Sequence, residues 1–393
     1  MRIRKKLGEK SRIFVIFLTL RPSPPRSMND PADEHIHLWK PETSCRTLDD
    51  NGLPTNLREQ DLERIQKVLG KAYAPQTHST YRTGLLIFHS FCDHKNISEE
   101  HHAPVDHTIL TSFISTLVGT YGGNTMRNYI YSVHAWHIIH RIKWEADNNE
   151  LETLLKAGHK LTPKEARRKL KEPWTLDYLT AICQGLKRDK PKDAAVLACL
   201  TTVFWGTARL GEVTIKNPKS FDPNIHVKVS NIRYSILDKN KIEVTAIFIP
   251  WTKVAQEKGE DIFWAKQHGI VDPESALANH MKINNPPPNA HLFAYKYRKG
   301  HQPMTHDSFL QRINKIVDEK GLNKRPAHGI QVGSTLEYLL HGVPFPVVKA
   351  KGRWQSDVFK GYLHNHAQIM APYMQAVPGT YETFIVNTMP PIC

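Results

Sequence analysis

The sequence predicts a mainly α-helical protein with a small antiparallel β-sheet, an α+β fold in which a helical domain precedes a larger mixed domain. In residues 57–161, apolar residues recur three and four positions apart, which is the spacing of the buried face of a helix. In residues 226–264, apolar and polar residues alternate in short runs between turns, which is typical of strands with one buried face. Helical spacing returns at residues 305–320, so we expect helices to surround a small sheet in the second half.

Length and charge narrow the class of protein. The chain has 393 residues, enough for two or three domains with sizeable cores, and a formal net charge of +15 at pH 7. An excess of positive charge of this size favours a polyanionic partner such as double-stranded DNA. The five cysteines are scattered and form no CxxC pair, so the sequence indicates neither a disulfide framework nor a structural zinc site.

Residues 1–56 are rich in proline, serine and aspartate, and we expect them to form a disordered arm. The arm begins with basic residues and the apolar run 13–20, a pattern that resembles a signal peptide. Arg21 follows this run at once, however, and no small-residue cleavage site is evident. No apolar run is long enough to cross a bilayer, so we expect no membrane partner. The scattered cysteines fit a reducing compartment.

The helical domain is predicted at residues 57–161. Its helices are expected near residues 62–69, 81–88, 109–117, 124–140 and 150–157. Within the fourth helix, His134, His137 and His140 follow one another at i, i+3 spacing and could place zinc ligands on one face. No cysteine or carboxylate stands at a matching position, so packing or a phosphate contact is the favoured interpretation.

A basic linker is predicted at residues 162–174, because the segment is bounded by proline and short of apolar residues. A second domain is predicted at residues 175–380, followed by a tail at residues 381–393. Three basic side chains of the linker are candidates for contacts with DNA phosphates: Lys164, Arg167 and Arg168.

The first chemical motif of the second domain is an arginine that follows a buried helix. Residues 193–206 are strongly apolar and predict a helix without an exposed face. Arg209 comes directly after it, and Glu212 stands three positions further on, where its carboxylate could hold the guanidinium by a bidentate pair. Such a pair is either a structural contact or a fixed cation for a phosphate group.

Three further motifs belong to the same domain. Lys253 follows the second predicted strand in the run Trp-Thr-Lys. A helical pattern begins near His328 and stops at a glycine, and the run Gly352-Arg353-Trp354 then leads to Tyr362 on a short amphipathic segment.

Together these motifs resemble the tyrosine recombinases, the phage-integrase-like enzymes that break and rejoin DNA, over about residues 57–375. Among them the chain looks most like the copies carried by fungal mobile elements. The resemblance implies a helical core-binding domain with phosphate contacts at Arg82 and Arg127, followed by a catalytic domain. It also implies a tetramer on synapsed DNA and, for a chromosomal substrate in a eukaryotic cell, a nuclear location.

The resemblance assigns a role to each motif residue. Arg209 and His328 would supply positive charge around the scissile phosphate, and Trp354 would donate its indole N–H. Lys253 would protonate the leaving 5′ oxygen, and Tyr362 would attack the phosphorus to leave a 3′-phosphotyrosyl link.

Two assignments have alternatives. Tyr373 is the competing nucleophile, and Lys258 is the competing acid because it lies in the same turn as Lys253. The reverse attack by a 5′-hydroxyl reseals the strand, so the resemblance implies no metal ion, no ATP and no other cofactor.

One position departs from the family pattern His-x-x-Arg, because Gln331 stands where the second arginine is expected. Glutamine can donate hydrogen bonds to a phosphate but carries no charge. Loss of a charged donor to the transition state costs on the order of 3 kcal/mol, about a hundredfold in rate. Arg325 could supply a charge instead.

Three functions are compatible with the sequence. The leading hypothesis is a site-specific recombinase or integrase impaired by Gln331. The second is a catalytically inactive DNA-binding protein on the same fold, a domesticated or decayed mobile-element copy. The third is a type IB topoisomerase-like relaxase, which shares the chemistry but needs no target sequence.

Overall fold

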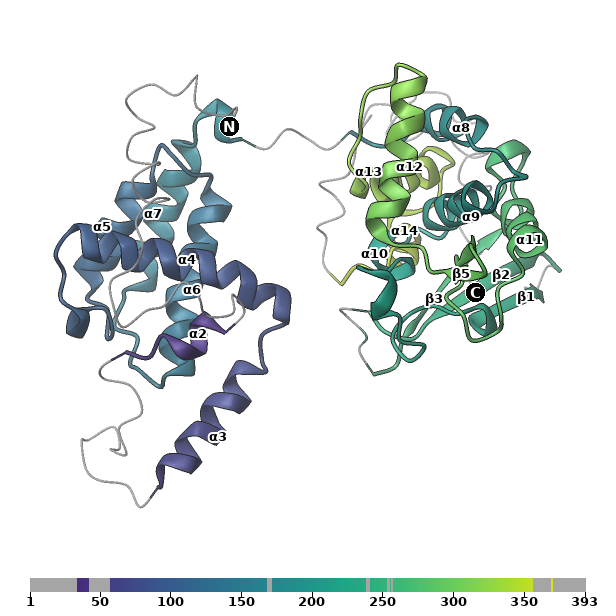
Figure 1. Cartoon of the computed structure of the whole chain (residues 1–393). Helices are drawn as coiled ribbons and strands as arrows, with labels where there is room; N and C mark the ends of the chain where they lie inside the picture. Colours follow the sequence, from purple (N-terminus) through teal and green to yellow (C-terminus); the bar gives the residue numbers. More distant parts are fainter. Residues whose placement is uncertain are drawn as a thin grey trace, which may run out of the picture. The chain divides into compact units, whose positions relative to one another are not determined.

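The computed structural model describes residues 34–41, 57–167, 172–237, 241–252, 255, 257–355 and 369 (Figure 1). The chain forms two compact units, Met1–Lys169 and Leu170–Cys393. The boundary between them falls within the segment 162–174. In the part of the chain that is described, no helix combines the length and the apolar character needed to span a lipid bilayer.

The first unit is helical throughout its described part, as the apolar spacing predicts. Its core includes Phe88, Phe113 and Trp136, which are almost fully buried. Asp106 and Asp147 each cap a helix by accepting a backbone N–H of the first turn. The predicted helices are confirmed with bounds at α3 (Glu59–Gly70), α4 (Pro75–His94), α5 (His107–Leu117), α6 (Gly123–Ile139) and α7 (Asn148–Lys160), with 3-10 turns at Glu99–His101 and Lys164–Ala166.

Residues 34–41 differ from the expectation of a disordered arm at residues 1–56. They contain a short helix, α2 (His35–Leu38), that contacts α4 and α6. The Trp39 side chain is 2% exposed, and its carbonyl accepts the indole N–H of Trp136 at 2.7 Å. Burial of apolar side chains from this otherwise polar segment stabilises it on the helical core. The rest of the arm lies outside the described residues.

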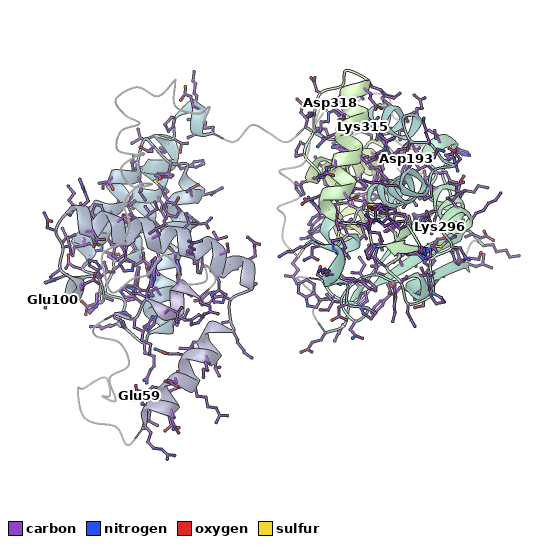
Figure 2. All side chains as sticks on the ribbon, viewed as in Figure 1. Glu59, Glu100, Asp193, Lys296, Lys315 and Asp318 are labelled. Atoms are coloured by element: carbon purple, nitrogen blue, oxygen red, sulfur yellow. The ribbon has the colours of Figure 1, made fainter. Side chains whose placement is uncertain are left out.

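The second unit is built around α9 (Pro191–Trp205). Every residue from 193 to 205 is buried, as the apolar sequence predicts. Asp193, which is labelled in Figure 2, lies in the first turn of this helix. It accepts two hydrogen bonds from the Arg312 guanidinium at 2.6 and 2.8 Å. The other described helices of this unit are α8 (Leu176–Gln184), α10 (Leu210–Val213), α11 (Pro273–Asn284), α12 (His306–Glu319), α13 (His328–Leu340) and α14 (Phe345–Lys351).

The small antiparallel sheet is also confirmed (Figure 1). Ile247 of the middle strand lies opposite Ile262 of the third, and both side chains are buried in the core of the unit. A separate two-stranded ribbon follows further along the chain. The strands are β1 (Ile232–Leu237), β2 (Glu243–Ile249) and β3 (Glu260–Ala265), paired in that order, with β4 (Tyr295–Tyr297) and β5 (Gly300–Gln302) in the ribbon.

The first strand begins at Ile232, later than the start near His226 that the alternating sequence predicts. Residues Val229–Asn231 form a 3-10 turn, and Lys228 makes only an isolated bridge with His291. The alternation continues through this turn because Val227 lies in the core of the unit and Val229 packs against it.

A close backbone approach holds α13 in place. A Cβ atom added at Gly333 would lie 2.0 Å from the carbonyl oxygen of Trp174, so the position requires glycine. The Trp174 backbone N–H donates to Gly329 O at 2.9 Å, and its indole N–H donates to Pro326 O at 3.2 Å. These bonds fix the start of α13, and with it His328, against the segment that leads into α8.

Candidate active site

Arg209 stands at the N-terminal cap of α10, directly after the buried helix α9. The carboxylate of Glu212 accepts the Arg209 backbone N–H at 2.9 Å and its guanidinium Nη1 at 2.8 Å. The expected contact is therefore present, but it is not a two-nitrogen fork, because the second donor is the backbone. The Arg209 side chain is 38% exposed while Glu212 is 9% exposed. Glu212 thus anchors a guanidinium that still faces the surface.

Gln331 lies on α13 and supports the segment before Arg209. Its side chain is 2% exposed, and its Nε2 donates to the carbonyl of Thr207 at 3.2 Å. Thr207 has a left-handed backbone, φ +49°, and its hydroxyl lies 2.9 Å from the Ser334 hydroxyl. Two side chains of α13 therefore hold this strained residue. The Nε2 of Gln331 is engaged in this structural bond, and its Oε1 is buried without a hydrogen-bond partner among the described residues.

Arg325 does not supply the missing charge at position 331. Its Nη1 donates to the carbonyl of Pro173 at 2.5 Å, and its guanidinium lies 4.3 Å from the centre of the Tyr178 ring. Arg325 is therefore committed to the segment before α8.

Arg353 is the site residue that the sequence alone did not single out. It follows the C-terminal cap of α14, has φ +54°, and its side chain is 8% exposed. Its Nη2 donates to Glu212 Oε2 at 2.5 Å, and its Nε lies 3.5 Å from Glu260 Oε2. A charged residue between Gly352 and Trp354 was the available signal, but local spacing does not reveal which carboxylates it meets.

Glu260, at the start of β3, was also missed. Its Oε2 accepts the Thr252 hydroxyl at 2.7 Å, and Thr252 is the residue before Lys253. The Arg353 guanidinium therefore contacts two carboxylates, one that holds Arg209 and one that holds Thr252.

Trp354 packs inside the last described part of the unit. An added Cβ at Gly352 would come within 2.0 Å of its ring, so the ring lies directly over that glycine. The ring also packs against Leu336, Leu339 and Val348. Trp354 thus walls the region between α13 and α14, and His328, the first residue of α13, is half-buried.

Two of the predicted catalytic residues cannot be placed. Lys253 and Tyr362 lie outside the described residues, as does the alternative nucleophile Tyr373. The alternative acid, Lys258, is described and exposed in the turn between β2 and β3.

A pocket of about 650 Å³ opens beside Arg209. It brings the α10 segment together with the end of β2, the strand that leads to Lys253. Most of its wall is apolar, and three basic residues, Arg209, Lys216 and His226, contribute to the lining, which suits a phosphate group with its flanking sugars. The lining includes Arg209, Glu212, Lys216, His226, Trp251 and Thr252.

The predicted DNA contacts of the first unit are side chains with few partners of their own. Arg82 on α4 is half-buried, and Arg127 on α6 forms an exposed ion pair with Glu152 at 3.0 Å. Lys164 is exposed, and Arg167 donates through Nε to the carbonyl of Thr162 at 3.2 Å. Arg168 lies outside the described residues.

The histidine cluster of α6 serves packing. His137 accepts the Val105 backbone N–H through Nε2 at 3.0 Å, and its Nδ1 lies 2.8 Å from the carbonyl of Val133. His140 Nε2 lies 2.9 Å from the carbonyl of Ile36 in α2. Burial lowers the pKa of both His137 and His140 to about 4. These rings are neutral hydrogen-bonding groups of the core, with their nitrogens already occupied.

Comparison with known proteins gives matches in structure only. No protein-family model matches the sequence, and no curated protein matches it. The XerH site-specific recombinase, bound to a palindromic difH substrate in a post-cleavage complex, matches with a TM-score of 0.51 at 15% identity, covering 90% of this chain and 98% of that chain. The pre-cleavage complex of XerH with difH gives a TM-score of 0.47 at 15% identity, covering 89% and 99%.

A lambda integrase dimer bound to a COC′ core site gives a TM-score of 0.43 at 12% identity, covering 78% of this chain and 76% of that chain. At 15% identity, the match to the post-cleavage XerH complex establishes a shared fold.

Proposed function

We propose that this chain, which has the tyrosine-recombinase fold, breaks and rejoins double-stranded DNA at specific sites through a 3′-phosphotyrosyl intermediate. The observation that carries the proposal is the Arg209–Glu212 pair, which presents an anchored, partly exposed guanidinium in the lining of a 650 Å³ pocket. A fixed guanidinium is the group best suited to hold a phosphodiester in one orientation.

The proposed chemistry uses side chains alone. The Tyr362 oxygen attacks the scissile phosphorus, the bond from phosphorus to the 5′ oxygen breaks, and Lys253 gives its proton to that oxygen. Arg209, His328 and Trp354 donate to the non-bridging oxygens as charge develops on them. The phenolic proton leaves to solvent, and the reverse attack by a 5′-hydroxyl restores the DNA backbone.

Two further observations support a DNA substrate. The net charge of +15 supplies the electrostatic attraction that non-specific DNA binding requires. The matched XerH structure is that of a recombinase in complex with its difH substrate.

A second candidate function is DNA binding without cleavage. The observation that favours it is the state of Gln331, which is neutral, buried and bonded to the Thr207 carbonyl. In that case the second phosphate-binding cation is lost, and the chain is a domesticated or decayed mobile-element copy that holds DNA without forming a covalent link.

Covalent capture separates the two functions and requires no defined target site. The full chain is incubated with a pool of nicked duplexes whose central sequence is randomised, and protein–DNA adducts that resist SDS are recovered and sequenced. We expect enrichment of one sequence, and loss of the adduct in Tyr362→Phe but not in Tyr373→Phe. Recovery of adducts without any sequence preference would instead indicate a relaxase of the type IB topoisomerase kind.

The variant Gln331→Arg decides between an impaired and an inactive enzyme. An adduct in the unmodified protein that forms up to about a hundredfold faster in Gln331→Arg indicates an impaired recombinase. An adduct in Gln331→Arg alone indicates a silent scaffold that binds DNA. An adduct in neither protein contradicts the recombinase proposal.

The same proposal has consequences for the oligomeric state of the protein on DNA and for its location in the cell. A recombinase that exchanges strands needs two duplexes, so we propose a tetramer on synapsed DNA. For a chromosomal substrate in a eukaryotic cell, we also propose a nuclear location. Mass measurement of the complex with the captured duplex tests the first, and imaging of a fluorescent fusion tests the second. A monomer on one duplex, or exclusion from the nucleus, contradicts the respective proposal.

A further inference from the structure

Two carboxylates converge on the proposed phosphate site. Glu212 contacts the Arg209 guanidinium, and Glu260 accepts the Thr252 hydroxyl next to Lys253. A carboxylate beside a bound phosphodiester repels it, and it also cancels the charge of the cation that it contacts. The site therefore needs a further cation before Arg209 and Lys253 can act on an anion with their full charge.

Arg353 is the cation that contacts both carboxylates. Its Nη2 lies 2.5 Å from Glu212 Oε2 and its Nε lies 3.5 Å from Glu260 Oε2. Because only 8% of the Arg353 side chain and 9% of Glu212 are exposed, water screens this contact weakly. Arg209, Glu212 and Glu260 alone would carry an excess of negative charge, whereas with Arg353 the charges of the four side chains balance.

The guanidinium of Arg353 is not saturated by these contacts. Its Nη1 is buried and has no hydrogen-bond acceptor among the residues that the structure describes. A buried donor without an acceptor is costly, and such a group in a folded protein calls for a functional explanation. The side chain at position 331 cannot take this role, because its amide is neutral and bonded to Thr207.

We propose that Arg353 is a positioning residue that restores the positive charge which Gln331 does not carry, by neutralising Glu212 and Glu260 so that Arg209 binds the scissile phosphate. This inference rests on the proposed recombinase function and assigns the second cation of its site. Arg353 enters from the turn after α14, whereas position 331 lies on α13. The charge is thus supplied from a different element of the fold.

The test compares two linkages at the cleaved position of the captured duplex. One is the natural phosphodiester, and the other is a methylphosphonate, in which a methyl group replaces one charged oxygen. A neutral linkage has less need of a second cation. We expect Arg353→Gln to slow adduct formation about a hundredfold on the phosphodiester and much less on the methylphosphonate.

Two companion variants separate charge from structure. Gln331→Arg in the Arg353→Gln background returns a cation to the site, and we expect it to recover part of the phosphodiester rate. Arg312→Gln is the matched structural control, because Arg312 forms a buried pair with Asp193 on the first turn of α9, with side chains 15% and 9% exposed. It is expected to lower stability while keeping the wild-type ratio of the two rates.

Each outcome decides the inference. Equal slowing on both linkages in Arg353→Gln, or no slowing at all, overturns the electrostatic role of Arg353 and leaves the recombinase proposal intact. If Arg353→Gln does not fold, Arg353→Lys replaces it, because lysine keeps the positive charge without the guanidinium geometry. Arg353→Lys must then retain the wild-type ratio of the phosphodiester rate to the methylphosphonate rate, and a changed ratio overturns the inference. If the unmodified chain forms no adduct with any duplex of the pool, the proposed function fails and the role of Arg353 fails with it.

Discussion

Glu212 and Arg353 lie 141 positions apart in the sequence, yet their side chains are joined by a hydrogen bond of 2.5 Å. The same carboxylate holds Arg209, so one buried acid is shared by a residue of its own helix turn and by a residue from the end of α14. This shared contact ties the proposed phosphate-binding arginine to the last described helix of the second unit.

The first prediction concerns Glu212→Gln. Removing the charge leaves the buried Arg353 guanidinium without its main partner, and we expect the free energy of unfolding to fall by about 3 kcal/mol. Urea denaturation measures the change. Glu319→Gln is the matched control, because Glu319 is 54% exposed and pairs with Lys315 at 3.9 Å. We expect the control to change stability by less than about 1 kcal/mol. A loss in Glu212→Gln no larger than this would contradict the buried network.

The second prediction concerns Gln331→Leu. The substitution keeps the approximate size of the buried side chain but removes the donor to the Thr207 carbonyl. We expect a loss of about 1–3 kcal/mol in the free energy of unfolding, because a buried carbonyl loses its partner. Gln311→Leu on the exposed side of α12 serves as the control and should leave stability nearly unchanged. Equal stability of Gln331→Leu and the unmodified chain would argue against the supporting role of Gln331.

The third prediction concerns pH. Burial lowers the pKa of His137 from its ordinary value of 6.5 to about 4, so the unfolded state binds more protons between these limits. Stability therefore falls as the pH drops from about 6.5 to about 4, by about 3 kcal/mol for this one group. His137→Gln can still donate and accept but does not titrate, so its stability should fall less over this range. Urea denaturation at a series of pH values measures the difference.

The control for the pH prediction is His101→Gln, because the His101 side chain is 59% exposed. It should keep the pH dependence of the unmodified chain. If His137→Gln and the unmodified chain lose stability in parallel below pH 6.5, then His137 is not held neutral by burial.

The fourth prediction concerns Gly333→Ala. The added Cβ would lie 2.0 Å from the Trp174 carbonyl oxygen, and a backbone atom cannot move away as a flexible side chain can. We expect a loss of about 1–3 kcal/mol or more from overpacking, seen as a lower melting temperature. At Gly300 an added Cβ meets nothing within 4 Å, so Gly300→Ala is the matched control. Similar melting temperatures for the two variants would contradict the close approach of α13 to residue 174.

The fifth prediction concerns the contribution of basic residues of the first unit to DNA binding. If Lys164, Arg167 and Arg168 each neutralise a phosphate, their joint replacement by glutamine lowers the slope of log K against log salt by roughly 3. Arg127→Gln should lower it by roughly 1, because its ion pair with Glu152 is exposed and exchangeable. A fluorescence titration with a duplex at several salt concentrations gives the slope. Lys315→Gln on the exposed side of α12 (Figure 2) is the control. A decrease in slope there equal to that of Arg127→Gln would mean that these slopes report net charge alone.

The sequence by itself determined most helices and strands of the fold and the Arg209–Glu212 pair of the site. Apolar spacing predicted α3 to α7 and the buried helix α9, because a helix repeats its buried face every three or four residues. Alternation predicted the small sheet, with the start of β1 placed too early. The sequence predicted the contact of Glu212 with Arg209 because the two residues are three positions apart. Side chains at this spacing on a helical turn are neighbours in any fold. The motifs together indicated the tyrosine-recombinase fold.

Only the tertiary structure decided which distant side chains meet. The bond of Gln331 to Thr207 spans 124 positions, and the bond of Trp136 to Trp39 spans 97. The partners of Arg353 likewise come from α10 and β3. No local periodicity relates such residues, because their separation is set by how helices and strands pack around a common core and not by the geometry of a single element.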